Sequence, residues 1–298
     1  MPLHRTLIAA AIAACLLTAC DRAPAPAGDA QTPPAAAAPA SIADVELIQR
    51  DALFGNPDRA NVQISPDGKY LSWIAAVDGV MNIWVAPAND MARARAVTSD
   101  TARGIRQYFW SHRPDTLLYL RDTGGDEDFH LFSVDLATGQ SRDLSNFPKT
   151  RAQVVGVSHL HPDAVMVAMN DRDPKWHDLY RVDLATGART LVEKNTLEVA
   201  EYMVDPDFKV RMAMKSRPDG GSDLLAPDGK GGWTIADEIP FEDSITTFPA
   251  GFTADGKTQY FIDSRGRDTA ALVAVDIASG SKTVVHQDTR ADVSDALR

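Results

Sequence analysis

The stretch Ile64-Ser65-Pro66-Asp67-Gly68-Lys69-Tyr70-Leu71 places a tight turn directly before an apolar run. Proline presets φ, aspartate bonds to nearby backbone, and glycine accepts positive φ. The same unit returns, in a less complete form, around Pro114, Pro162, Pro206 and Ala254, at successive steps of 48, 48, 44 and 48 residues from Pro66. A nearly fixed step of this length indicates a repeat architecture.

A second marker has the same spacing. Val-Asp-Leu-Ala-Thr-Gly occurs at residues 134–139 and again at 182–187, 48 residues apart, and Val-Asp-Ile-Ala-Ser-Gly follows at 275–280. In each copy the glycine is expected to close a hairpin between the third and fourth strands of a repeat. Two different turn signatures with one spacing fix the register of the repeat.

Each repeat holds four short apolar runs, and four strands in about 40–50 residues are typical of a β-propeller blade. The sequence therefore predicts an all-β propeller with five recognisable four-stranded blades. A helical solenoid is excluded because no apolar period of 3.6 residues is present, and a β-sandwich would not repeat its turns so regularly. The blades are expected at about residues 61–99, 107–145, 153–193, 200–237 and 248–286.

Residues 287–298 are expected to begin a further blade, since the next proline-type turn falls due four residues beyond Arg298. The ring is therefore predicted to be incomplete in this chain. Such an ending would expose strand edges that can pair with other chains.

The sequence of the N-terminus predicts a targeting segment rather than part of the folded domain. Residues 7–17 form an apolar run too short to span a bilayer, and the run ends in Leu17-Thr18-Ala19-Cys20, which resembles a bacterial lipobox. This resemblance implies a signal peptide at 1–19, a lipid on Cys20, and attachment to a membrane on its periplasmic side, with inner or outer membrane left open. Residues 20–43, rich in alanine and proline, are expected to form a tether, and the propeller to occupy 44–298.

Composition narrows the possible partners. The formal net charge of −11 argues against nucleic-acid binding. Cys15 and Cys20 are the two cysteines, and both precede the folded part, which therefore has no disulfide, cysteine nucleophile or zinc–thiolate site. We predict no cofactor and no metal; His159 and His161 flank a turn but lack a matching partner.

Several segments together resemble a known family: residues 53–57, the turn at 64–69, the loop Thr123-Gly124-Gly125-Asp126-Glu127-Asp128 with its continuation to Leu131, and residues 291–293. They resemble the N-terminal propeller of prolyl oligopeptidase family serine peptidases, of the bacterial dipeptidyl aminopeptidase/acylaminoacyl-peptidase type. In that family an α/β-hydrolase domain with a Ser-Asp-His triad follows, and the propeller admits only short or unfolded peptides to it.

No catalytic residue is predicted within the 298 residues. The Gly-x-Ser-x-Gly elbow of such hydrolases is missing, because Ser158 follows Gly156 but Leu160 replaces the second glycine. Two hypotheses remain. The chain is the substrate-gating propeller of a periplasmic lipoprotein peptidase, inactive alone; or it is a lipid-anchored, TolB-like propeller that binds a peptide or protein without chemistry.

Asp126, Glu127 and Asp128 form the candidate site. In a propeller the loops between second and third strands share one face, which would place this loop on the same face as residues 171–178 and 264–268. The functional interpretation is that Asp126 and Glu127 face the catalytic domain or bind the amino end of a peptide. The structural interpretation is a solvated hairpin tip whose acids accept hydrogen bonds from local backbone amides.

Overall fold

The computed structural model describes residues 47–294 and divides the chain into two units, Met1–Leu53 and Phe54–Arg298. Cys20, the signal segment, the tether and residues 295–298 lie outside the described residues. The helix α1 (Arg50–Phe54) is short and exposed throughout. Within the described residues no helix is long and apolar enough to cross a bilayer.

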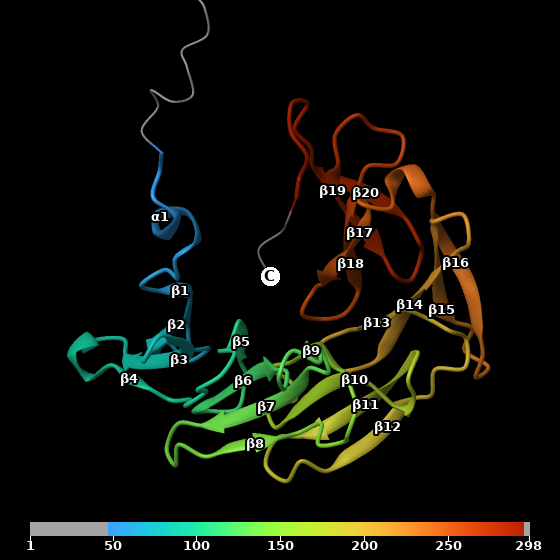
Figure 1. Cartoon of the computed structure of the whole chain (residues 1–298). Helices are drawn as coiled ribbons and strands as arrows, with labels where there is room; N and C mark the ends of the chain where they lie inside the picture. Colours follow the sequence, from blue (N-terminus) through green and yellow to red (C-terminus); the bar gives the residue numbers. More distant parts are fainter. Residues whose placement is uncertain (1–46, 295–298) are drawn as a thin grey trace, which may run out of the picture. The chain divides into compact units, whose positions relative to one another are not determined.

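The second unit contains five four-stranded antiparallel sheets, each a meander whose strands pair in chain order. The sheets follow one another along the chain (Figure 1). The first two blades consist of β1 (Ala60–Ile64), β2 (Tyr70–Val77), β3 (Val80–Pro87) and β4 (Arg95–Ala96), then β5 (Gln107–Trp110), β6 (Thr116–Arg121), β7 (His130–Asp135) and β8 (Ser141–Asp143).

The remaining three blades confirm the predicted four-strand pattern. They consist of β9 (Ala152–Val157), β10 (Ala164–Asp173), β11 (Trp176–Asp183) and β12 (Arg189–Glu193); β13 (Glu201–Val204), β14 (Val210–Ser216), β15 (Ser222–Pro227) and β16 (Trp233–Ile239); and β17 (Phe248–Phe252), β18 (Thr258–Asp263), β19 (Ala271–Asp276) and β20 (Lys282–His286). Two short 3-10 turns, η2 (Met91–Arg93) and η3 (Phe241–Asp243), lie in connections.

Both sequence markers form the turns that their residues favour. Gly68 has φ +73° and donates its N–H to the Ser65 carbonyl at 2.8 Å. In the second marker, Gly139 has φ +71° and donates to the Asp135 carbonyl at 2.8 Å, while Asp135 Oδ1 accepts from the Thr138 N–H at 2.8 Å. These positions favour glycine because other residues are strained at such φ values.

Hydrophobic layers between neighbouring sheets hold the blades together. The first layer joins blades 1 and 2 through residues such as Ile83, Val85 and Trp110, and comparable layers follow between each later pair of blades. No strand among residues 47–294 pairs the fifth sheet with the first. The ring is therefore not closed by the described strands.

Residues 287–294 form no strand, but they are fixed on blade 5. Val293 donates its N–H to the Ala270 carbonyl at 3.0 Å and packs with Ile262 and Ala270. Ile105 makes the corresponding bond to Met81, at 2.8 Å, in the connection that leads from blade 1 to blade 2. Residues 287–294 therefore make the same kind of backbone hydrogen bond to the preceding blade as the connection between blades 1 and 2.

The hairpin between β10 and β11 differs from the expected loop. We expected residues 171–178 to be a loop, but strands extend to Asp173 and restart at Trp176. The reason is a pair of hydrogen bonds across the hairpin: Arg172 Nε and Nη2 donate to the two Asp178 carboxylate oxygens at 2.6 and 2.7 Å. This bidentate pair makes charged residues compatible with a strand.

Candidate functional site

The acidic loop lies between β6 and β7, and its sequence dictates its shape. Gly124, Gly125 and Glu127 have φ values of +65°, +89° and +60°. Asp126 Oδ1 accepts hydrogen bonds from the N–H groups of Thr123 and Asp128 at 3.2 and 3.1 Å. Asp126 therefore has a structural role within the loop, and Glu127 is exposed at its tip.

The acidic loop packs against the connection from blade 1 to blade 2. A Cβ atom at Gly125 would lie 2.8 Å from Arg103 Nη1, and the φ of +89° at this position also favours glycine. Arg103 Nε also lies 3.4 Å from Asp122 Oδ2, a buried carboxylate at the end of β6. Acidic and basic groups from two blades thus meet on one face of unit 2.

A cavity of about 300 Å³ adjoins this contact and is called here the blade 1–2 cavity. Its polar wall consists of Arg103, Arg106, Asn56 and Asn61, and its apolar wall includes Ile74, Met81 and Ile105. No carboxylate is among its lining residues in the described part of the chain. Sequence reasoning missed this cavity because its residues come from three separate segments.

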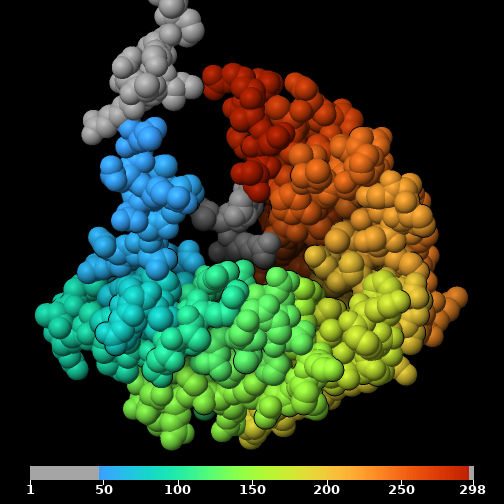
Figure 2. Space-filling view, in the orientation of Figure 1, coloured from blue at the N-terminus to red at the C-terminus, as the bar shows by residue number. Residues whose placement is uncertain are grey.

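A second cavity, the inner-strand cavity, has a volume of about 550 Å³. It is lined by parts of β9, β13 and β17, the first strands of blades 3, 4 and 5, including Val154, Glu201, Met203 and Phe252. Figure 2 shows that unit 2 is hollowed on the side toward which these strands face. Each of the three is the terminal strand of its sheet and so presents an edge without a partner strand in that sheet.

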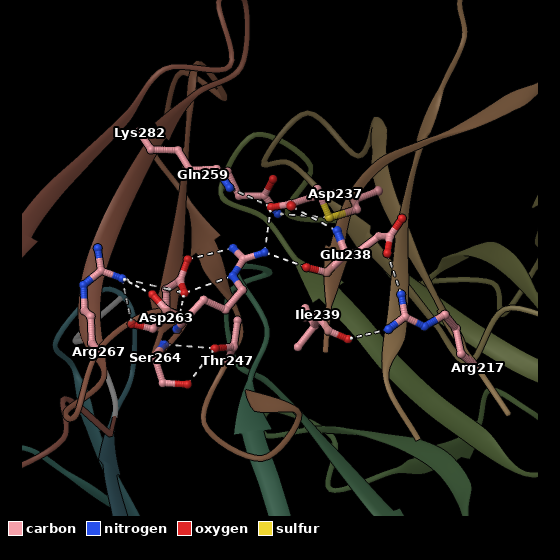
Figure 3. A network of polar contacts seen from close by, with 12 residues as sticks. Arg217, Asp237, Glu238, Ile239, Thr247, Gln259, Asp263, Ser264, Arg267 and Lys282 are labelled. Atoms are coloured by element: carbon pink, nitrogen blue, oxygen red, sulfur yellow. Dashed lines mark hydrogen bonds and ion pairs between the residues drawn. The ribbon is translucent and has the colours of Figure 1, made fainter. Parts of the chain in front are cut away.

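A polar network fixes the seam between blades 4 and 5, whose first strands line the inner-strand cavity (Figure 3). Arg265 of blade 5 contacts Asp263 at 2.7 Å and, across the seam, Asp237 at 3.0 Å. Arg265 Nη1 also donates to the Glu238 carbonyl at 2.7 Å. Lys282 reaches the same Asp237 carboxylate at 2.8 Å from a more exposed position.

The buried aspartates predict acid sensitivity. Burial is the largest single influence on Asp178 and Asp263 and raises their pKa. Hydrogen bonds from Arg172 and Arg265, backbone hydrogen bonds and the nearby positive charges together lower it by more, so each pKa lies below the ordinary 3.8. Burial also lowers the pKa of His177 from 6.5. All three groups bind protons more weakly when folded, so stability falls as pH decreases.

We expect the thermal midpoint to fall modestly between pH 7 and pH 5, where His177 is affected, and steeply below about pH 4, where Asp178 and Asp263 become protonated. Thermal unfolding followed by circular dichroism from pH 7 to pH 3 measures this. A midpoint unchanged down to pH 3 would contradict the assigned ion pairs.

The remaining sequence candidates have structural contacts. Ser158 directly follows β9; its hydroxyl donates to the Pro206 carbonyl and accepts from the Leu160 N–H at 3.1 Å. His161 Nε2 lies 3.2 Å from Asp207, and His159 packs edge-on against His112. Among the described residues no group of three histidine, cysteine or acidic side chains could hold a metal ion.

Five antiparallel meander sheets around a common hollow define the class of the protein: a β-propeller. Solved structures share this fold. An acylaminoacyl peptidase from Pyrococcus horikoshii is 18% identical, with 80% of this chain and 40% of that chain covered and a TM-score of 0.51. The propeller domain of the trilobed protease from Pyrococcus furiosus is 17% identical, with 78% and 72% covered and a TM-score of 0.50.

The sequence comparison identifies a relative at much higher identity than the structures that share the fold. The chain is 64% identical over 268 residues to dipeptidyl aminopeptidase BIII of Pseudoxanthomonas mexicana, which covers 90% of this chain and 39% of that protein. No family model matches the chain. The 64% identity, together with the fold shared with peptidase propellers, confirms the resemblance noted in the sequence to the propeller part of the prolyl oligopeptidase family. The chain spans about two fifths of the length of this relative.

Proposed function

We propose that this chain is the substrate-gating propeller of a serine peptidase that releases short fragments from peptides. The 64% identity to a dipeptidyl aminopeptidase over nearly the whole described part carries this proposal. The hydrolysis itself needs a Ser-Asp-His triad, and the 298 residues contain no Gly-x-Ser-x-Gly segment. The proposed role of this chain is to receive peptides, not to cleave them.

The inner-strand cavity supports this role. Its walls are mostly uncharged, with Glu201 as the charged lining residue, and free strand edges border it. An extended peptide can add main-chain hydrogen bonds to such an edge and place its side chains in adjoining hollows. A folded protein cannot present an extended segment in this way, so the arrangement favours short or unfolded chains.

The role expected for Asp126 and Glu127, at the face shared by the loops between second and third strands, is proposed here in an altered form. Asp126 is occupied by the loop's own amides, whereas Glu127 and Asp128 make no ion pair with described residues. We propose that these two side chains contact the amino end of a peptide or the catalytic domain. Membrane attachment through a lipid on Cys20, facing the periplasm, belongs to the same proposal and rests on the lipobox sequence.

Reading the coding DNA past the codon for Arg298 tests the proposal. We expect an open frame that continues to a Gly-x-Ser-x-Gly segment, followed by an aspartate and a histidine of a triad. A genuine stop codon directly after Arg298 would contradict the peptidase proposal and would favour a propeller that binds a peptide or protein without chemistry.

A further inference from the structure

The blade 1–2 cavity combines two arginines with a rigid backbone. Arg103 and Arg106 both line it, together with the side-chain amides of Asn56 and Asn61. Arginine presents a planar fork of donors that matches the two oxygens of a carboxylate. The chain has a net charge of −11, yet this cavity is lined by two guanidinium groups and by no carboxylate. The local charge of the cavity is therefore opposite to that of the whole chain.

Two acids near this cavity, Asp122 and Asp100, are already engaged. Asp122 pairs with Nε of Arg103, which leaves the Nη groups of that guanidinium without an acidic partner among the described residues. Asp100 accepts from the backbone N–H groups of Ala102 and Gly104, at 3.3 and 2.7 Å. Arg106 makes no ion pair in the described part of the chain. The positive charge at the cavity is therefore only partly compensated.

The segment that carries both arginines is held in place before any ligand arrives. Asn82, fully buried in β3, donates to the Asp100 carbonyl at 2.9 Å and accepts from the Asp100 N–H at 2.7 Å. Gly104 has φ +76°, and a Cβ there would lie 3.0 Å from Met81 backbone atoms. Ile105 then bonds to the Met81 carbonyl at 2.8 Å.

Blade 1 also fixes the far end of the segment. Asn61 Nδ2 donates to the Arg106 carbonyl at 3.3 Å, from the first strand of blade 1. Because the backbone on both sides of each arginine is bonded to blade 1, a ligand needs to order only the side chains. Such preorganisation is what a binding site requires and a solvated loop does not.

We propose that the blade 1–2 cavity is a carboxylate-binding subsite, in which Arg103 and Arg106 bind a carboxylate of a peptide ligand. This inference rests on the proposed function, because the ligand is the peptide that the propeller receives. The carboxylate can be the C-terminus of the peptide or the side chain of an aspartate or glutamate. The acidic loop packs on Arg103 through Gly125. The same face of unit 2 therefore carries both acidic and basic groups.

Binding of three short fluorescent peptides to the 298-residue chain, measured by anisotropy, tests the subsite. The peptides share one sequence: one has a free C-terminal carboxylate, one a C-terminal amide, and one a C-terminal amide with a single aspartate. We expect at least one carboxylate peptide to bind about three- to tenfold more tightly than the plain amide, with the advantage reduced at high salt. The peptide that gains identifies which carboxylate is bound.

Arg106→Gln should remove this advantage, and Arg106→Lys should retain part of it, because lysine keeps the charge but loses the fork. Arg93→Gln is the matched control: Arg93 is an exposed arginine of blade 1 that does not line this cavity, and its replacement should leave all three affinities unchanged. Thermal midpoints of the variants, expected to equal that of the unaltered chain, separate lost binding from lost folding.

Two results would overturn the subsite. Equal affinity of all three peptides, in the unaltered chain and in Arg106→Gln, would remove the carboxylate subsite while leaving peptide reception intact. Failure of every peptide to bind, whatever its charge, would contradict the proposed function as well.

Discussion

Replacing Arg265 by methionine is expected to destabilise the propeller by about 2–3 kcal/mol. The side chain of Arg265 is 19% exposed and that of its partner Asp263 is 6% exposed. Methionine preserves most of the volume but leaves the Asp263 carboxylate buried. Among residues 47–294, its remaining partners are the N–H of residue 265, at 2.9 Å, and the Arg267 guanidinium, at 3.9 Å. The cost comes from that uncompensated charge more than from the lost contact.

Lys282→Met provides the matched control for Arg265→Met. Lys282 contacts Asp237 just as Arg265 does, but its side chain is 46% exposed, so its removal should cost less than about 1 kcal/mol. Combining Asp263→Asn with Arg265→Met should recover part of the loss, because the buried charge is then gone. Urea unfolding measures all four proteins. Equal losses for Arg265→Met and Lys282→Met would show that the seam does not depend on the buried pair.

Leu131→Ala is the second large effect that we expect, with a loss of about 3 kcal/mol. Leu131 lies in β7, is fully buried, and packs in the layer between blades 2 and 3 with residues such as Val165 and Val182. Both sides of the layer are regular sheets and close poorly around a cavity, so most of the removed volume remains empty. Unfolding in urea, monitored by tryptophan fluorescence, gives the difference in free energy.

Leu191→Ala serves as the control for Leu131→Ala. Leu191 lies in β12 and is 50% exposed, so the same chemical change should cost well under 1 kcal/mol. A loss at Leu131 no larger than that at Leu191 would contradict the assigned packing of blade 2 against blade 3.

The blade register could be predicted because the turns leave a local signal in the sequence. The turn at Gly68 and the hairpin at Gly139 require positive φ, which glycine adopts without strain. A glycine at these positions therefore marks the turn in the sequence. Blade 4 shows the limit of this signal. Phe208 occupies the position equivalent to Gly68 and has φ +61°; it is buried and stacks on His161 at 4.9 Å, which offsets the strain.

The candidate site could be predicted only in part. The acidic loop was found because Gly124 and Gly125 mark a turn beside three acids. Arg103 and Arg106 were missed because their placement depends on the hydrogen bonds between buried Asn82 and Asp100, which are 18 residues apart, and no spacing rule reveals such a pair. Arg265 and Asp237 were missed for the same reason, since they meet only when two blades pack.

We propose that this chain gates the substrates of a serine peptidase. The most direct measurement is turnover of a dipeptidyl nitroanilide by two proteins: the 298-residue chain and the product of the coding frame read through Arg298. We expect no turnover by the chain itself, and turnover by the longer product that a serine-directed inhibitor abolishes. Inhibitor-sensitive turnover by the 298 residues alone, or none by the longer product, would contradict this proposal.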